Sequence, residues 1–180
     1  VTSLIAATNI NKHKNKKNHL LFIDFKKAFD SVGHDSLKLA MQKLGFNNQT
    51  VDTIFNLIHD SFTFINTPLG RTEQVPLKRG TKQGDCISPC LFNLFIEILI
   101  RYIDSKEKGI PISNKKKLSI LPYADDIVIC SDNFNDLQSL ANNLSLYCEY
   151  FNFHINYKKS AYMNNDVNNH NNIIINKINS

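Results

Sequence analysis

Three aspartates are the residues of this sequence with the clearest chemical potential. Asp24 lies near the end of the apolar run at residues 20–25, and Asp125 and Asp126 lie between two further apolar runs. Carboxylates that converge repel one another, and a cation between them relieves that repulsion. Mg²⁺ is the expected cation because it prefers oxygen ligands and no cluster of Cys or His nearby suits zinc. Because two such ions support phosphoryl transfer, the sequence indicates a phosphoryl-transfer site.

Each acid also has a simpler interpretation. Asp24 can pair with a neighbouring lysine, Lys26 or Lys27, and the adjacent Asp125 and Asp126 are typical of an ordinary turn. Successive strand residues point to opposite faces, so the adjacent acids can serve one site only from a turn, and unequally. We therefore expect Asp24 and Asp125 to bridge the metal ions and Asp126 to contribute less.

The elements that must position these acids follow from the apolar pattern. Helical spacing of apolar residues occurs in residues 35–44, 49–59, 88–102 and 134–151. Apolar runs typical of strands occupy residues 20–25, 118–122, 127–130 and 154–157, with a smaller hairpin at 62–67 and 74–78. The main elements match a split βαββαβ, ferredoxin-like α+β fold, which is an antiparallel sheet with helices on one face. In that topology Asp24 faces the hairpin tip that carries Asp125 and Asp126.

Local signals indicate where some helices begin and end. Gly45 follows the first helix as a C-terminal stop, and Ser88 with Pro89 forms the cap and first position of the third. The third helix is apolar almost all round, so we expect it to be buried. The lysine- and asparagine-rich residues 11–18 are predicted to form a solvated loop.

The composition limits the class of protein. With 180 residues, of which 42% are hydrophobic and 21% charged, the chain can bury a sizeable core, which excludes a wholly disordered or fibrous protein. The net charge of +5 is compatible with a polyanionic partner without establishing one. The four cysteines form no C-x-x-C pair and predict free thiols. Because no secretion or membrane-spanning signal is evident, we expect an intracellular protein, nuclear or cytoplasmic, with no membrane partner.

Four segments of the chain resemble motifs A to D of one enzyme family, in that family's order. The segments are residues 22–32, with the sequence FIDFKKAFDSV, then 80–89 (GTKQGDCISP), 123–126 (YADD) and 155–160 (INYKKS). The family is the reverse transcriptases of non-LTR, LINE-type retrotransposons, and the resemblance covers roughly residues 19–163. It implies a polymerase palm fold and an RNA-directed DNA polymerase that joins dNTPs to a DNA primer on an RNA template.

The resemblance also implies roles for the acids and their neighbours. Asp24 and Asp125 would hold two Mg²⁺ ions, for which Mn²⁺ can substitute. Asp126 would lie beside them, and the backbone carbonyl of Phe25 would be a further oxygen ligand. This implied ligand set agrees with the oxygen-preferring site that the three carboxylates indicate by themselves.

Other matched positions would contact the nucleotide. Phe29 would lie under the sugar of the incoming nucleotide and exclude a ribose 2′-hydroxyl, although by composition alone a Phe is typical of a core. Gln83 and Gly84 would lie against the nascent base pair, where glycine allows a close backbone approach. The same loop must also be the turn that leads into the cap at Ser88.

Four further residues have roles that the resemblance leaves more open. Lys159 matches a lysine proposed to protonate the leaving pyrophosphate, although a lysine in this polar stretch can simply be solvated. Tyr123 would lie near the primer end or pack under the hairpin. Lys82 is a candidate primer or template contact. His34 is expected to cap the following helix rather than react.

The domain organisation is expected to be simple. Residues 1–163 would form the palm with part of the fingers, and residues 164–180 an asparagine-rich, low-complexity tail. Because the chain begins with Val1 and shows neither full fingers nor a thumb, we interpret it as a piece of a longer protein, with no prediction of its oligomeric state. Two alternatives are an inactive, truncated remnant and a group II intron-type reverse transcriptase. Asn152 replaces a glycine usual before motif D and can still adopt a left-handed turn conformation.

Overall fold

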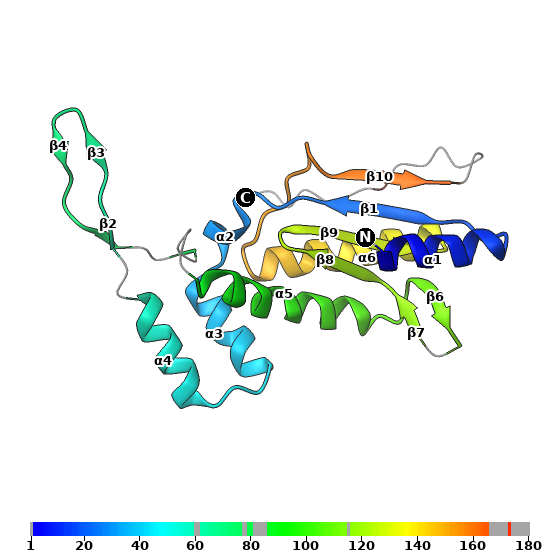
Figure 1. Ribbon diagram of the computed structural model, residues 1–180, viewed down its shortest axis with the longest axis horizontal. Helices are drawn as coiled ribbons and strands as arrows, with labels where there is room; N and C mark the ends of the chain where they lie inside the picture. Colours follow the sequence, from blue (N-terminus) through cyan, green and yellow to red (C-terminus); the bar gives the residue numbers. More distant parts are fainter. Residues whose placement is uncertain are drawn as a thin grey trace. The chain divides into compact units, whose positions relative to one another are not determined.

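The structure is a computed structural model that describes residues 2–59, 62–76, 79–80, 86–114, 116–165 and 173. The chain folds into two compact units (Figure 1). The first combines residues 1–28 with residues 99–180, and the second is formed by residues 29–98. Because of this division, Asp24, Asp125 and Asp126 all lie in the first unit.

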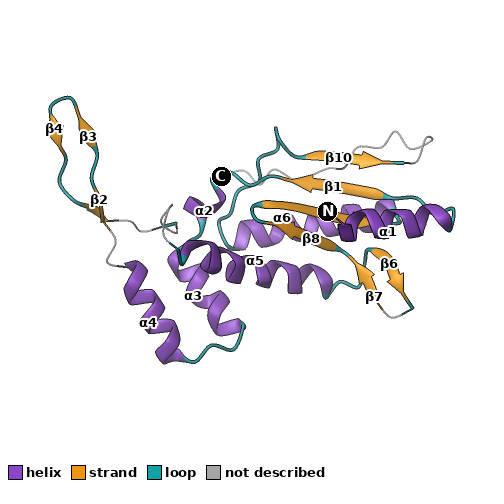
Figure 2. Cartoon of the chain, viewed as in Figure 1, coloured by secondary structure: helices purple, strands orange, loops and turns teal. Residues whose placement is uncertain are grey.

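A four-stranded antiparallel sheet is the centre of the first unit (Figure 2). Its strands are β1 (His19–Ile23), β8 (Ile120–Tyr123), β9 (Asp126–Ser131) and β10 (Ala161–Asn164). The order across the sheet is β10-β1-β9-β8, and each neighbouring pair is antiparallel. With α5 (Ser88–Asp104) and α6 (Phe134–Tyr150) between strands along the chain, this order confirms the predicted βαββαβ arrangement.

Helix α6 packs against β1 and β9 on one face of the sheet. Asn133 caps its start, because the side-chain oxygen accepts hydrogen bonds from the backbone N–H groups of Asn135 and Asp136 at 2.8 and 3.2 Å. Its buried face contains Leu137, Leu140, Ala141, Leu144 and Cys148. Asn152, two residues beyond the helix, has a φ of 50°, which confirms the predicted left-handed conformation.

Two elements that the sequence pattern does not predict cover part of the opposite face. They are helix α1 (Thr2–His13) and the hairpin of β6 (Ile110–Ser113) and β7 (Lys116–Leu118). Ala7 of α1 and Ile110 of β6 form a buried cluster with Leu20 and Cys130, which are partners across β1 and β9. Burial against this cluster, rather than an apolar stripe of its own, therefore accounts for α1.

The prediction of a solvated loop at residues 11–18 is wrong at both ends of the segment. Residues 11–13 belong to α1, and Asn11 is fully buried. Its side-chain Nδ2 donates to Oδ1 of Asn18 at 3.0 Å, and Asn18 is buried as well. Between them, Lys16 is exposed and pairs with Asp132 at 2.8 Å. Hydrogen bonding between two asparagines thus closes the connection between α1 and β1.

Helix α5 begins at Ser88 and Pro89, as predicted, and runs from the second unit into the first. Its buried apolar side chains are Leu91, Phe92, Phe95, Ile96, Leu99 and Ile103. Near its end, the hydroxyl of Tyr102 donates to Oδ1 of Asn143 in α6 at 3.0 Å. Within the described part of the chain, no helix combines the length and the apolar character that a membrane crossing requires.

The short helix α2 (Ala28–Ser31) leads into the second unit. There, α3 (His34–Lys43) and α4 (Asn48–His59) pack against each other. Gly45 follows α3 with a φ of 91°, which confirms the predicted stop. The predicted hairpin is formed by two ladders, β2 (Phe62–Thr63) with β5 (Val75–Pro76) and β3 (Asn66–Thr67) with β4 (Gly70–Arg71).

The prediction of a strand at residues 154–157 is wrong. Only Ile155 forms a bridge there, and the fourth strand of the sheet is β10. A turn is the reason, because the backbone carbonyl of Asn156 accepts the N–H groups of both Lys159 and Ser160, at 3.1 and 3.0 Å. Residues in such a turn cannot be extended, so pairing with β1 begins only after it.

The expected boundary between the palm and the tail falls inside β10. Asn164 is the last residue of that strand, one residue beyond the expected boundary. Asn165 is also tied to the fold, because its Oδ1 accepts the backbone N–H of Asn18 at 2.7 Å. Of the later residues in the predicted tail at 164–180, Ile173 alone belongs to the described part. The tail therefore remains a prediction for the rest of that segment.

The four cysteines divide into exposed and buried thiols. Cys86 and Cys90 are exposed, whereas Cys130 and Cys148 are buried, and burial raises the pKa of each buried thiol to about 12. The thiolate is the reactive form, so a raised pKa slows reaction. At about pH 8 we expect a maleimide to label only Cys86 and Cys90 in the native protein, and all four cysteines after denaturation. Mass spectrometry checks this, and rapid native labelling of Cys130 would contradict its burial beneath α1.

Candidate active site

The tip of the β8–β9 hairpin is a two-residue turn. Tyr123 pairs with Asp126 across it, and Ala124 and Asp125 form the turn itself. Ala124 has a φ of 55°, the left-handed conformation that the tight turns between antiparallel strands require. Asp125 therefore lies in the turn, and Asp126 is the first residue of β9.

The pairing of β1 with β9 brings the end of β1 to this tip (Figure 1). Ile23, the last residue of β1, pairs with Ile127. Continuing the ladder by one position places Asp24 opposite Asp126, with Asp125 next to it in the turn. Residues about 100 positions apart in the chain thus come together through strand register alone.

The three carboxylates differ in exposure and have no cationic partner in the described part of the chain. Asp24 and Asp125 are half-buried, and Asp126 is exposed. No Lys or Arg among the described residues forms an ion pair with any of the three. The alternative interpretation of Asp24, a pair with Lys26 or Lys27, is therefore not what the structure has.

The donor chemistry at this edge suits a hard divalent cation, because it consists of carboxylate and carbonyl oxygens. The described residues nevertheless form no group of three Asp, Glu, His or Cys side chains gathered closely enough to hold a metal ion. Carboxylates repel one another when no cation compensates their charge. The edge of the sheet therefore carries oxygen donors that suit a divalent cation, but their side chains are not already arranged around a metal position.

Asp24 is held by the turn at residues 156–160. The side-chain Nδ2 of Asn156 donates to Oδ2 of Asp24 at 2.7 Å, and the backbone N–H of Asn156 donates to the carbonyl of Asp24 at 2.8 Å. The backbone N–H of Asp24 donates to Oγ of Ser160 at 3.3 Å. Asn156 and Ser160 belong to the segment that resembles motif D, but the sequence predicted no role for them. Their contacts with Asp24 exist only in the folded chain.

The residue after Asp24 fixes the same segment from the core side. Phe25 is buried against Phe153, with ring centroids 4.3 Å apart. Phe25 also forms a bridge with Ile155, in which the backbone N–H of Lys26 donates to the carbonyl of His154 at 2.9 Å. The carbonyls of Asp24 and His154 accept the backbone hydrogen bonds of this bridge. The carbonyl of Phe25, the predicted oxygen ligand, is not among these acceptors.

In the second unit, Phe29 packs as a partly buried aromatic residue. Its ring centroid lies 4.5 Å from that of Phe92, which is fully buried in α5. Phe29 itself is only half-buried, so part of the residue is exposed. The contact agrees with the interpretation as a core residue, and the exposed part leaves the nucleotide role as a prediction.

His34 does not cap α3, so that expectation is wrong. Gly33 is the cap residue and provides no side-chain hydrogen bond. The His34 ring is buried, and its Nε2 donates to the carbonyl of Gly80 at 3.1 Å. The backbone N–H of Gly80 in turn donates to the carbonyl of Val32 at 2.8 Å. This connection ties the end of the motif A segment to the first residue of the motif B segment.

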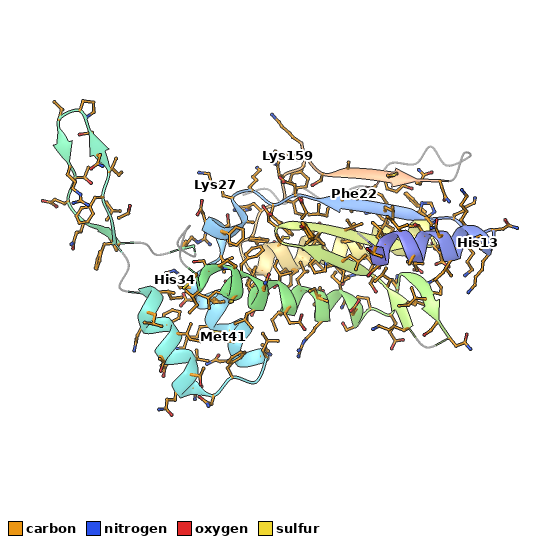
Figure 3. All side chains as sticks on the ribbon, in the orientation of Figure 1. His13, Phe22, Lys27, His34, Met41 and Lys159 are labelled. Carbon is orange, nitrogen blue, oxygen red and sulfur yellow. The ribbon has the colours of Figure 1, made fainter. Side chains whose placement is uncertain are left out.

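The remaining predicted site residues fall into two groups. Lys82, Gln83 and Gly84 lie outside the described residues, so their roles stay predictions. Lys159 is exposed on the turn before β10 (Figure 3). Tyr123 is 76% exposed, so it does not pack under the hairpin. A position near the primer end is the interpretation of Tyr123 that remains.

The chain is similar in sequence to known proteins. The model of the family "Reverse transcriptase (RNA-dependent DNA polymerase)" matches residues 2–171. The Pol polyprotein of type-1 retrotransposable element R2 from Popillia japonica is 31% identical over 138 residues, covering 77% of this chain and 22% of the relative. That of type-2 element R2DM from Drosophila melanogaster is 34% identical over 118 residues, covering 66% and 11%. The chain thus spans about a fifth or less of the length of these relatives.

Solved structures show the same fold. Telomerase from Candida tropicalis, truncated from its C-terminal domain, superposes with a TM-score of 0.68 at 15% identity, covering 92% of this chain and 34% of that one. Telomerase from Candida albicans, in complex with a TWJ fragment of telomeric RNA, gives 0.67 at 14% identity, covering 91% and 29%. At such low identity these likenesses show the polymerase palm fold alone. The family match and the R2 relatives go further: the chain belongs to the reverse transcriptase (RNA-dependent DNA polymerase) family, as a domain of the LINE-type, non-LTR retrotransposon kind.

Proposed function

We propose that this chain is the palm, with part of the fingers, of an RNA-directed DNA polymerase from a LINE-type element. It would join a dNTP to the 3′-hydroxyl of a DNA primer on an RNA template. The observation that supports this proposal is the strand register, in which Ile23 pairs with Ile127 just before Asp24 and Tyr123 pairs with Asp126 at the hairpin tip, in a chain of the reverse transcriptase family. Much of the rate would come from positioning the two substrates in line.

Reverse transcriptases use divalent metal ions. For this chain we propose that Asp24 and Asp125 hold two Mg²⁺ ions, with Asp126 and the carbonyl of Phe25 beside them and Mn²⁺ as a substitute. When bound, such ions activate the attacking hydroxyl and stabilise charge on the transferred phosphoryl group and its leaving group. The half-buried Asp24 and Asp125 would keep their carboxylates oriented at one edge of the sheet.

The other matched residues have proposed roles that follow from their chemistry. Phe29 would exclude a ribose 2′-hydroxyl by its bulk, and Lys159 would give a proton to the leaving pyrophosphate. Gln83 and Gly84 would lie against the nascent base pair. Tyr123 and Lys82 would contact the primer or template. We further propose that the protein works inside the cell, in the nucleus or cytoplasm.

Primer extension tests the proposed function. A purified polypeptide that carries this chain with its flanking sequence should extend a DNA primer on an RNA template with dNTPs and Mg²⁺, and EDTA should stop the reaction. We expect the 180-residue chain alone to extend the primer only weakly, because contacts that hold the primer–template duplex supply much of the positioning. Replacing dNTPs by rNTPs should also stop extension, since Phe29 would reject the 2′-hydroxyl. No extension by the longer polypeptide would favour an inactive remnant.

A further inference from the structure

We propose that Asn156 is a positioning residue for Asp24, which holds one carboxylate oxygen and leaves the other directed to a divalent cation. The inference rests on the proposed function, because it concerns the same edge of the sheet. Asn156 donates twice to Asp24, from Nδ2 to Oδ2 at 2.7 Å and from its backbone N–H to the carbonyl at 2.8 Å. Two bonds from one residue fix both the main chain and the rotation of the carboxylate.

The second carboxylate oxygen is the one that a cation would bind. Within the described part of the chain, Oδ1 of Asp24 has no hydrogen-bond partner. Asp24 is only half-buried, so part of the residue is accessible to solvent. A carboxylate whose other oxygen is already occupied binds a metal ion through one oxygen, in a defined direction.

The chemical type of the donor matters. A lysine at position 156 would neutralise Asp24 and compete with the cation, whereas the amide of Asn156 is neutral. It removes the rotational freedom of the carboxylate and leaves its negative charge for the metal. Removing a group that orients a metal ligand in this way typically weakens metal binding about 10- to 100-fold.

Asn156 is itself held in place, as a positioning residue must be. Its carbonyl accepts the N–H groups of Lys159 and Ser160, at 3.1 and 3.0 Å, and the hydroxyl of Ser160 at 3.0 Å. The bridge between Phe25 and Ile155 fixes the chain on its other side. Asn156 therefore sits between a tight turn and a buried bridge, and its amide needs little reorganisation to contact Asp24.

Mn²⁺ binding tests the proposal without relying on activity. Free Mn²⁺ is measured by electron paramagnetic resonance while the metal is titrated into the purified chain, and Asp24→Asn identifies the ion that depends on this site. We expect Asn156→Ala to raise the Kd of that ion about 10- to 100-fold. Asn142→Ala is the matched control, because Asn142 is exposed on α6 and its Oδ1 contacts only Gln138 in the described part. It should leave the Kd unchanged.

A second variant separates positioning from simple support of the turn. Asn156→Asp keeps the size of the side chain but places a second carboxylate against Asp24. We expect a lower melting temperature than the native chain in EDTA, and recovery of most of the loss on adding Mn²⁺, because the cation relieves the repulsion. A structural role alone would give the same loss with and without Mn²⁺.

The outcomes distinguish this proposal from the proposed function. An unchanged Kd in Asn156→Ala, or a native chain without any Asp24-dependent ion, overturns the positioning role. Neither result depends on primer extension. Conversely, the Asn156→Ala substitution could weaken Mn²⁺ binding in a polypeptide that does not extend a primer. That result would support the positioning role of Asn156 and contradict the proposed polymerase function.

Discussion

Replacing Asp125 by Asn should lower primer extension by about 10³-fold or more while the protein stays folded. The substitution keeps the size of the side chain and removes the charge that would hold a metal ion. Metal ions supply several kcal/mol of transition-state stabilisation, and each 1.36 kcal/mol corresponds to about tenfold in rate. Asp125 is half-buried and has no ion pair within the described residues, so stability should change by less than about 1 kcal/mol.

The control variant for Asp125→Asn is Asp136→Asn. Asp136 lies in α6 and pairs with Lys108 at 3.1 Å, with more than a third of its side chain exposed. An ion pair of that kind contributes about 1 kcal/mol at most, so extension should stay within about twofold. Circular dichroism and melting temperature establish that both variants fold. Extension by Asp125→Asn at a tenth of the native rate or faster would overturn the assignment of Asp125 as a metal ligand.

Gly80→Ala should destabilise the second unit by about 3 kcal/mol and reduce primer extension. Gly80 has a φ of 85°, a left-handed conformation that residues with a Cβ adopt at a cost. A Cβ at this position would also lie 2.9 Å from Cα and 3.0 Å from the carbonyl oxygen of Asp30. Both are backbone atoms, so neither can move aside as a flexible side chain would.

The matched variant is Gly45→Ala. Gly45 also has a positive φ, of 91°, but a Cβ there would meet no atom within 4 Å. Gly45→Ala should therefore lower the free energy of unfolding only by the strain of the left-handed conformation, about 1 kcal/mol. Urea unfolding measures both free energies. Equal costs for the two variants would show that the contact between Gly80 and Asp30 is not tight in solution.

The consequence for activity follows from what Gly80 connects. His34 donates to its carbonyl, and its N–H donates to the carbonyl of Val32, so Gly80 anchors the start of the motif B segment to the end of motif A. The predicted nucleotide contacts Gln83 and Gly84 follow within four residues. Displacing the anchor should therefore weaken dNTP use, seen as a raised KM in the primer-extension assay.

Much of the local structure was predictable because its causes lie within a few residues. Alternating and helical apolar patterns indicated β1, β8, β9, α3, α4, α5 and α6, and end signals at Gly45 and Ser88 indicated helix boundaries. The same local reasoning failed at residues 154–157, where the turn at Asn156 replaces a strand. It also missed α1, whose burial depends on a cluster with Leu20 and Cys130.

The candidate site was predictable only in part, for a related reason. The three acids and the motif residues around them are visible in the chain, and the βαββαβ order predicts that β1 ends beside the hairpin tip. Which acid lies opposite Asp24 required the register of β1 with β9, which pairs Ile23 with Ile127 and, continued by one position, sets Asp24 against Asp126. A shift of one residue in that register would reverse the outcome.

The amino-acid sequence by itself determined which segments are helical or extended, where the acids lie along the chain, and which family the motifs resemble. Only the tertiary structure decided what holds those acids. Asn156 contacts Asp24 across 132 positions, and His34 contacts Gly80 across 46. Propensities and turn signals act over a few neighbouring residues, whereas these hydrogen bonds exist only after strand pairing and burial have brought distant segments together.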